Sequence, residues 1–141
     1  MKYRKAEKAD LDQVVRVAST AFEDYLFLKV IKDLVRDLKQ YPVFVEKMMR
    51  ILVRIFFKHH ICLVAEKNTE IYAVALLQKG PIPFRLYLLN GGIGLLKFIS
   101  LKNILSYLKF MEDTDKELEQ NVDFDWYLML LAVAPKHQRQ G

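Results

Sequence analysis

Cysteine is nearly absent from this sequence, and its scarcity excludes two kinds of cross-link. Cys62 is the only cysteine in 141 residues, so the chain can form neither an internal disulfide nor a cage of cysteine ligands around a metal. His59 and His60 stand near Cys62, but chain neighbours point in different directions and no second cluster supplies ligands, so we expect no metal site. The lone cysteine fits a reducing setting, and we predict a cytoplasmic protein.

Long apolar runs are also missing. The opening stretch, MKYRKAEKADLD, is charged and lacks the apolar core of a secretory signal. The most membrane-like stretch, LYLLNGGIGLLKF, is interrupted by Asn90, two glycines and Lys97 before it reaches the ~18 apolar residues that a membrane span requires. No internal repeat, low-complexity tract or linker divides the chain, so we expect residues 1–141 to belong to a single domain without a membrane segment.

Basic residues exceed acidic ones, with 22 Lys and Arg against 17 Asp and Glu and a net charge of +5. Such a charge attracts anionic partners, and a basic stripe could meet one: Lys47, Arg50, Arg54 and Lys58. The same excess is common in soluble domains, and the stripe is typical of a solvated helix face, so we expect no nucleic-acid partner. The competing hypothesis of a nucleic-acid-binding domain predicts an affinity that falls steeply with salt.

The N-terminal half of the chain predicts one strand followed by helices. We expect the strand at 3–6, and we expect Asp10 to cap the next helix with Gln13 returning the hydrogen bond. Apolar residues at helical spacing predict that helix: Leu11, Val14, Val15, Ala18 and Phe22. The stretch 25–40 is also expected to be helical, Pro42 marks a boundary, and 43–58 predicts a stronger helix.

The C-terminal half predicts a hairpin, a long apolar segment and a buried strand. ICLVAEK and IYAVALLQ are β-rich runs separated by the turn-prone NTE, which predicts a β-hairpin. Residues 84–111 are unusually apolar, and this segment could serve core packing, a substrate pocket or a dimer contact. Within it we expect a helix that follows the glycines and runs through Leu95, Phe98, Ile99, Leu105 and Leu108. Acidic residues dominate 112–125, which we interpret as a solvated connector. WYLMLLAV lacks polar alternation and predicts a strand in the middle of a sheet, covered on both faces.

The segment after this strand has the composition of an anion site. Glutamines, basic residues and Gly141 follow Pro135. If a helix begins near Lys136, its first amide groups have no partners within the helix and its dipole is positive there, so both favour a phosphate oxygen. Glycine would let the backbone approach that oxygen closely.

The sequence LLAVAPKHQRQG resembles the acetyl-CoA motif of the GNAT superfamily of N-acetyltransferases. Val133, Pro135, Gln138 and Gly141 match this motif in order and spacing, directly after a long apolar strand. The expected order of strand, helices, hairpin and strand is also similar to the family over the whole chain. The resemblance implies an α/β (α+β) fold with a mixed central sheet flanked by helices. WYLMLLAVAP is similar to members that acetylate small molecules, including antibiotic acetyltransferases.

The resemblance also implies roles for individual residues. The pantetheine arm of acetyl-CoA would be held by the main chain of three strand residues: Leu131, Ala132 and Val133. The pyrophosphate would be cradled by the amides of four residues, of which the second also adds charge: Gln138, Arg139, Gln140 and Gly141. Members of the family let an amine attack the thioester directly, which requires two positioned substrates and a base but no protein nucleophile. Cys62 is therefore expected to be a small buried residue.

Carboxylates before the last strand are the candidate bases. The family often uses a carboxylate on or near this strand, so Asp125 is our first choice and Asp123 the second, with Glu112 farther upstream. Any of these side chains could attract a cationic amine or accept its proton. All three also fit the solvated role of an acidic connector.

The family motif continues beyond Gly141, as does the family fold. We therefore expect residues 1–141 to be the N-terminal portion of a truncated domain whose own activity is doubtful. The last strand would then lie at a sheet edge, and we expect a homodimer that covers it. The leading hypothesis is an acetyl-CoA-dependent N-acetyltransferase acting on a small-molecule amine. The alternatives are a protein or peptide N-acetyltransferase, and a noncatalytic acyl-CoA-binding or interaction module; the sequence identifies neither the acceptor nor the preferred acyl chain.

Overall fold

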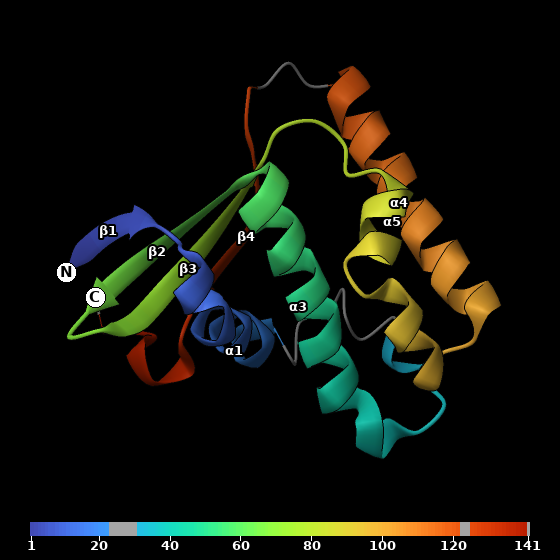
Figure 1. Cartoon of the computed structure of the whole chain (residues 1–141), viewed down its shortest axis with the longest axis horizontal. Coiled ribbons are helices and arrows are strands. Elements are labelled where there is room, and N and C mark those ends of the chain that lie inside the picture. Colours follow the sequence, from blue (N-terminus) through green and yellow to red (C-terminus); the bar gives the residue numbers. More distant parts are fainter. Residues whose placement is uncertain (23–30, 122–124, 141) are drawn as a thin grey trace.

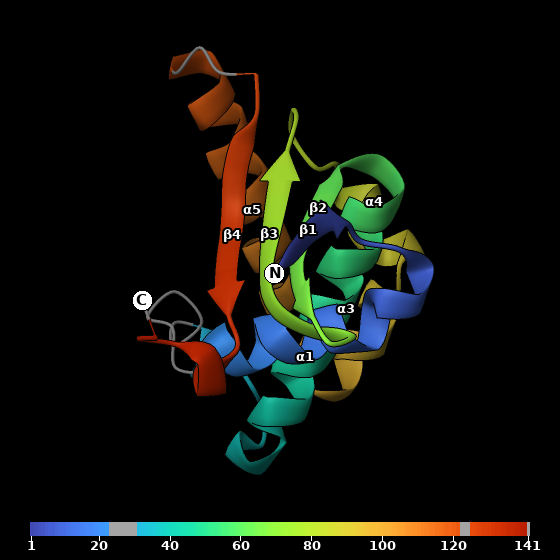
Figure 2. The ribbon, with the colours of Figure 1, turned by 90° about the vertical axis from the view of Figure 1, so that its left-hand side faces the viewer.

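The fold is built on an antiparallel sheet with helices packed over one face. A computed structural model describes residues 1–22, 31–121 and 125–140. The four strands are β1 (Lys2–Lys5), β2 (Ile61–Lys67), β3 (Glu70–Gln78) and β4 (Tyr127–Val133), and they lie side by side in that order (Figures 1 and 2). Every pairing among these strands is antiparallel, so the described residues form an α+β fold without the mixed sheet expected from the sequence.

The hairpin between β2 and β3 confirms the sequence prediction. Its turn consists of Asn68 and Thr69, which have positive φ angles of 52° and 64°. Two consecutive residues with positive φ form the hairpin turn whose twist matches that of the flanking strands. The hairpin therefore follows from local sequence.

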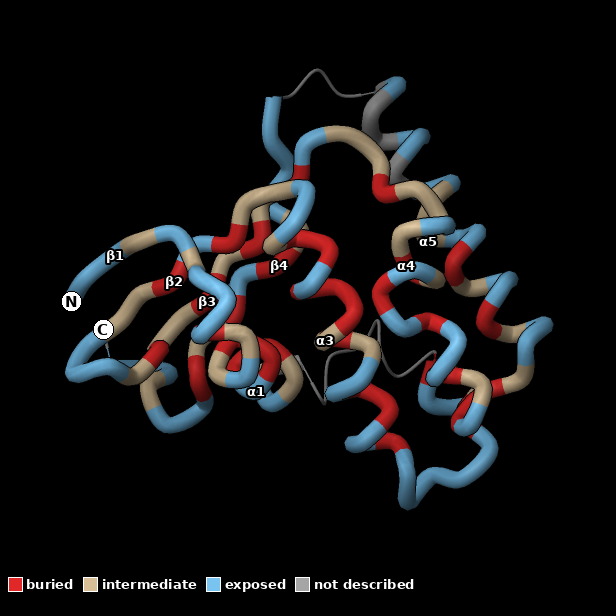
Figure 3. Tube along the Cα trace, in the orientation of Figure 1, coloured by how far each residue is buried: buried red, intermediate tan, exposed pale blue. Residues whose placement is uncertain are grey.

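Two helices cover one face of the sheet. Helix α1 (Leu11–Phe22) and helix α3 (Tyr41–His59) pack against each other and against the strands. Both expose a polar side and bury an apolar one, which Figure 3 shows as alternating red and blue segments. Pro42 lies in the first turn of α3, where its missing amide proton costs no hydrogen bond, so the boundary predicted at this proline is confirmed.

A second helical layer packs on the outer side of α3 (Figure 1). It consists of α4 (Phe84–Leu89), the 3-10 helix η3 (Gly92–Lys97) and α5 (Leu101–Asn121). The helix expected after the glycines, from Leu95 to Leu108, is divided between η3 and α5, because the helical path is interrupted at 98–100. Helix α4 lies before the glycines and is separated from η3 by Gly91, which adopts a positive φ of 113°. Much of this apolar segment is buried.

Several expectations from the sequence are wrong in this region and near the N-terminus. The connector expected at 112–125 is helical as far as Asn121, and residues 122–124 lie outside the described residues. Within this helix Lys116 forms an ion pair with Glu112, one turn earlier, at 2.9 Å. The helix expected at 25–40 is absent over 33–37, where Asp37 instead caps the short helix η2 (Leu38–Gln40). The part of this prediction at 25–30 lies outside the described residues.

The predicted cap of the first helix is also wrong. The Asp10 carboxylate accepts a hydrogen bond from the Glu7 amide at 2.7 Å, at the start of the 3-10 helix η1 (Lys8–Asp10). The Gln13 side chain does not return a bond to Asp10. It accepts from the Ile71 amide at 3.1 Å and donates to the Thr69 carbonyl at 3.3 Å, so it fastens α1 to the tip of the hairpin.

Strand β4 is the outermost strand of the described sheet, not a central one as its composition predicted (Figure 2). Leu130 and Ala132 are buried beneath the helices, whereas Leu128 and Leu131 are exposed on the opposite face. The strand is therefore apolar on both faces, although the described residues cover only one. The expectation that this strand lies at an edge is confirmed for these residues.

Candidate cofactor site along strand β4

The outer edge of β4 presents main-chain groups to solvent. The Ala134 amide donates to the Tyr72 carbonyl at 2.8 Å, and Ala132 lies opposite Val74 in the same register. In an antiparallel pair, alternate residues direct their N–H and C=O groups toward the partner strand and away from it. The main-chain groups of Leu131 and Val133 therefore face the open edge, and those of Ala132 face β3. Two of the three residues expected to hold pantetheine thus have the required direction.

The loop after β4 bends back on the strand. Pro135–His137 form the single 3-10 turn η4, after which Gln138 is extended with ψ of 151°. The helix expected to begin near Lys136 is therefore absent from the described residues, and with it the helix dipole invoked for a phosphate. The Gln138 side chain instead donates to the Val133 carbonyl at 2.9 Å, and Arg139 adopts a positive φ of 60°.

Polar side chains tie this loop to the hairpin. Glu70 forms an ion pair with Lys136, and its carboxylate lies 3.8 Å from Nε2 of His137. The hydrogen bond from Lys136 holds the pKa of Glu70 below its usual range. The His137 ring stacks on the Tyr72 ring, with centroids 3.5 Å apart and planes 7° apart. Glu70 thus offsets the charge of Lys136, while Arg139 stays exposed.

The sequence gives no signal for this role of Glu70, because Glu70 and Lys136 are distant along the chain and meet only through the pairing of β3 with β4. The other predicted members of the loop are close to the strand. The Gln140 side chain donates to the Lys136 carbonyl at 2.9 Å. Gly141 lies outside the described residues.

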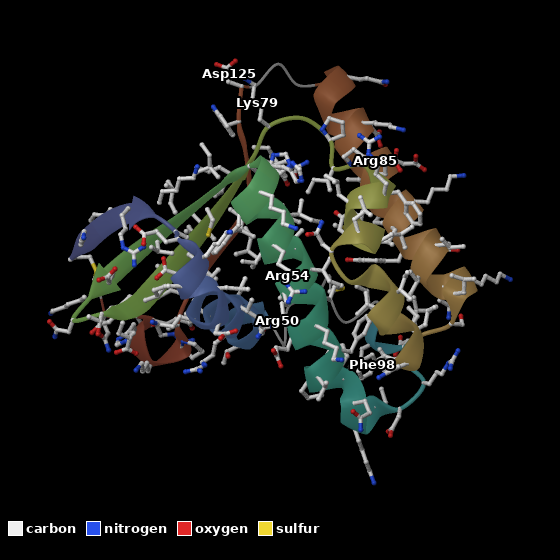
Figure 4. The ribbon with its side chains drawn as sticks, viewed as in Figure 1. Arg50, Arg54, Lys79, Arg85, Phe98 and Asp125 are labelled. Atoms are coloured by element: carbon white, nitrogen blue, oxygen red, sulfur yellow. The ribbon has the colours of Figure 1, made fainter. Side chains whose placement is uncertain are left out.

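The candidate bases lie at the opposite end of β4 from this loop. Asp125 is exposed and is separated from the strand by Trp126, on the same side of the molecule as Lys79 (Figure 4). The neighbouring Trp126 ring lies 5.7 Å from the Lys79 ammonium. Asp123 lies outside the described residues, and Glu112 is on α5 in its ion pair with Lys116. The predicted cofactor residues that the structure describes, 131–133 and 138–140, therefore lie at one end of β4, and the length of the strand separates them from Asp125.

A cavity of about 260 Å³ lies beside the same strand, between α3 and the second helical layer. Its walls include Leu52 of α3, Leu95 of η3 and Leu108 of α5, and Leu130 of β4 closes one side. The apolar segment 84–111 therefore supplies much of the lining, one of the uses considered for it from the sequence. The participation of β4 was not predicted, because no local pattern reports which strand faces which helix.

Cys62 is a buried thiol, and it does not belong to a cluster of metal ligands among the described residues. Burial raises the pKa of the Cys62 thiol to about 12, with a further contribution from Asp10, so the group is a thiol at neutral pH. Among residues 1–22, 31–121 and 125–140, no three His, Cys, Asp or Glu side chains gather as metal ligands would. The expectation that Cys62 is a small buried residue agrees with its burial in the core.

The basic stripe of α3, of which Figure 4 labels Arg50 and Arg54, makes contacts within the chain. Arg50 binds Asp12 of α1 at 2.6 Å and Glu46 at 3.0 Å, which satisfies its charge locally. Lys58 donates to the Asn90 side chain at 2.9 Å, and Arg54 contacts the Asn90 carbonyl at 3.5 Å. These contacts fasten α3 to α1 and to Asn90 after α4, so the stripe is more than the solvated face expected from the sequence.

The chain matches no protein-family model and no curated protein. No helix within the described part of the chain combines the length and apolar character of a membrane span. Membership of the GNAT superfamily therefore stays a prediction from the sequence.

Proposed function

We propose that this chain carries the acyl-CoA-binding strand and loop of an N-acetyltransferase whose acceptor is the primary amine of a small molecule. The observation that carries the proposal is the open edge of β4, where Leu131 and Val133 direct main-chain groups outward directly before the motif-like loop. An amide-rich arm such as pantetheine can pair with such an edge as an added strand would. The resemblance of LLAVAPKHQRQG to the family motif supports the same assignment.

The reaction would be a direct transfer between two bound substrates. The neutral amine nitrogen attacks the thioester carbon, a C–N bond forms, and the C–S bond breaks. CoA leaves as a thiol, and the proton lost by the amine balances the proton gained by sulfur. Positioning the two reactants accounts for much of the acceleration in such reactions, so no protein nucleophile is needed.

Residues at different positions along β4 would bind different parts of the two substrates. The loop at Gln138 and Arg139 would meet the pyrophosphate through main-chain amides and one guanidinium charge. Leu131 would hold the pantetheine arm along the strand, and Val133 would contribute its amide, because its carbonyl accepts the hydrogen bond from Gln138. Asp125, at the far end, would attract the protonated amine and accept its proton.

Calorimetric titration of the chain with acetyl-CoA tests the cofactor assignment. We expect micromolar binding that is lost in the double variant Gln138→Glu, Arg139→Glu, because both changes place negative charge beside the pyrophosphate. The matched control is Gln40→Glu, Lys39→Glu, which makes the same change in charge on η2 and should bind as the unaltered chain does. A folded chain that binds no acetyl-CoA would refute the proposal.

Release of free CoA thiol distinguishes the enzyme hypotheses from one another. Thiol release with small amines supports the proposed acceptor class, whereas release only with peptides favours a protein N-acetyltransferase. Binding without thiol release, for any amine, favours a noncatalytic acyl-CoA-binding module. An Asp125→Asn variant should bind acetyl-CoA normally and release thiol more slowly, because the carboxylate acts on the amine and does not contact CoA.

A further inference from the structure

The cavity beside β4 has an almost entirely apolar wall. Met48 and Leu52 line it from α3, Ile104 and Leu108 line it from α5, and Ile99 lies between the helices. The polar groups in the lining belong to tyrosines and one threonine, and none of the described lining residues is charged. Burying a charged group in such surroundings is costly, whereas burying an uncharged hydrocarbon is favourable. The wall therefore selects an uncharged apolar ligand.

A bulge in β4 lies beside this cavity. The register shifts between Leu76 and Leu77 of β3, which leaves Met129 as the extra residue of β4. Met129 and Leu130 both line the cavity, although consecutive residues of a regular strand point to opposite faces. The bulge thus turns an additional side chain toward the cavity, as bulges beside binding sites often do.

The distance along the strand fits a thioester bound at its edge. Met129 lies four residues before Val133, a separation of about 13 Å at ~3.3 Å per residue. A pantetheine arm that extends from the loop past Val133 and Leu131 would bring its sulfur toward the bulge. Whatever acyl group the sulfur carries would then lie beside the cavity.

We infer that the cavity binds the hydrocarbon chain of an acyl-CoA, so that the preferred acyl group is a medium-length chain and not acetyl. The inference rests on the acyl-CoA-binding part of the proposed function and replaces acetyl by a longer acyl group as the preferred donor. The volume of about 260 Å³ exceeds the ~150 Å³ of an engineered apolar cavity that holds benzene, which allows a chain of roughly six to eight carbons. The amine is a poorer occupant, because its protonated head would find no carboxylate in the lining.

The acyl chain in the cavity would strengthen donor binding and position the thioester, without changing which bonds form and break. The amine nitrogen still attacks the thioester carbon, the C–N bond forms, the C–S bond breaks, and the amine proton balances the CoA thiol. The methylene groups beyond the carbonyl would lie between α3 and α5. The product would be an N-acyl amide with a medium-length chain.

Titration with CoA, acetyl-CoA and hexanoyl-CoA tests the inference. Hexanoyl-CoA has four more methylene groups than acetyl-CoA, and each contributes about fourfold when fully buried, which sets a ceiling on the order of 200-fold. We expect hexanoyl-CoA to bind at least ~10-fold more tightly than acetyl-CoA, since part of the ceiling is lost in ordering the chain. Equal affinities would overturn the inference and leave the proposed function standing. No binding of any CoA species would refute both.

A pair of phenylalanine variants on α5 locates the acyl chain. Leu108 lines the cavity and is 4% exposed, whereas Leu105 is 42% exposed and does not line it. Leu108→Phe fills the cavity, so it should abolish the preference for hexanoyl-CoA over acetyl-CoA. Leu105→Phe, the same change on the same helix, should keep the preference. An unchanged preference in folded Leu108→Phe would overturn the inference.

A second pair keeps the test decisive if Leu108→Phe does not fold. Thr114 lines the cavity yet is exposed, so Thr114→Phe can obstruct it without disturbing the core, and the adjacent exposed Asp113 supplies the control Asp113→Phe. We expect only Thr114→Phe to lower the hexanoyl preference. Thiol release with ethylamine and hexylamine tests whether the cavity holds the acyl chain or the amine. A rate that depends on the length of the amine, and not on the length of the acyl group, would overturn the assignment of the cavity to the acyl chain.

Discussion

Replacing Gly92 with alanine should destabilise the protein, because the new methyl group would collide with main chain. A Cβ atom at Gly92 would lie 2.7 Å from the Tyr87 carbonyl oxygen, whereas ordinary contacts begin near 3.4 Å. The obstacle is the backbone of α4, which cannot move aside as a flexible side chain could. Gly94 lies in the same 3-10 helix, and a Cβ atom there would meet nothing within 4 Å.

The expected magnitude follows from two opposing effects. Forcing an extra methyl group into packed structure costs about 1–3 kcal/mol, and removing a glycine from the unfolded chain returns about 0.4–1 kcal/mol. Gly92→Ala should therefore lower the free energy of unfolding by about 1–2 kcal/mol, while Gly94→Ala should leave it unchanged or raise it slightly. The two variants should differ by about 2 kcal/mol, which is roughly 6–8 °C in Tm for a chain of this size.

Thermal unfolding followed by circular dichroism measures this difference, with urea unfolding as an independent check. Gly92→Ala should also weaken hexanoyl-CoA binding, because Gly92, Tyr87 and Leu95 all lie in the cavity wall. Equal unfolding midpoints for the two alanine variants would refute the reasoning. The predicted loss of stability depends on the collision with the Tyr87 carbonyl, which occurs at Gly92 and not at Gly94.

Two further predictions concern the ion pairs at the N-terminus and the open edge of β4. Arg4 binds the Asp10 carboxylate at 2.6 and 2.9 Å, and these hydrogen bonds hold the pKa of Asp10 below its usual range. The carboxylate therefore contributes stability above its unfolded pKa of about 3.9, and this contribution is lost as the pH falls through the lower folded pKa. Asp10→Asn should cost about 1.5–3 kcal/mol at pH 7, and urea unfolding should show the difference from the unaltered chain shrinking below pH 4; a difference independent of pH would contradict this account. If β4 mediates self-association, Leu131→Lys should lower the apparent mass in light scattering, because it places a charge on an exposed edge. Leu101→Lys alters a residue of similar exposure on α5 and should have no effect; a monomeric unaltered chain would refute the expected homodimer.

Elements that depend on neighbouring residues were predictable from the sequence. The hairpin formed because Asn68 and Thr69 accept positive φ between two β-rich runs, and α3 formed because its apolar residues recur at helical spacing. The position of the motif-like loop directly after an apolar strand was likewise visible. Such signals act over a few residues, so propensity and patterning report them.

Features that depend on distant residues were not predictable. Gln13 was assigned to a local cap, but its hydrogen bonds go to Thr69 and Ile71, which lie across the fold. The bulge at Met129 depends on how β3 and β4 align, and the burial of one face of β4 depends on where α3 packs. No pattern within a single segment carries this information. The helical continuation to Asn121 was missed for a different reason, since the acidic composition outweighed good helix formers such as Leu118 and Lys116.

The tip of the β2–β3 hairpin should tolerate inserted residues less well than most turns between strands do. Short turns between strands usually tolerate inserted residues, because they project into solvent and carry few contacts. Here the Gln13 side chain of α1 accepts a hydrogen bond from the Ile71 amide near the tip. Glu70, the first residue after the turn, forms an ion pair with Lys136 of the loop that follows β4. A residue inserted beside Thr69 would displace both attachments together, so a two-residue turn far from Asp125 sets the position of the proposed pyrophosphate loop.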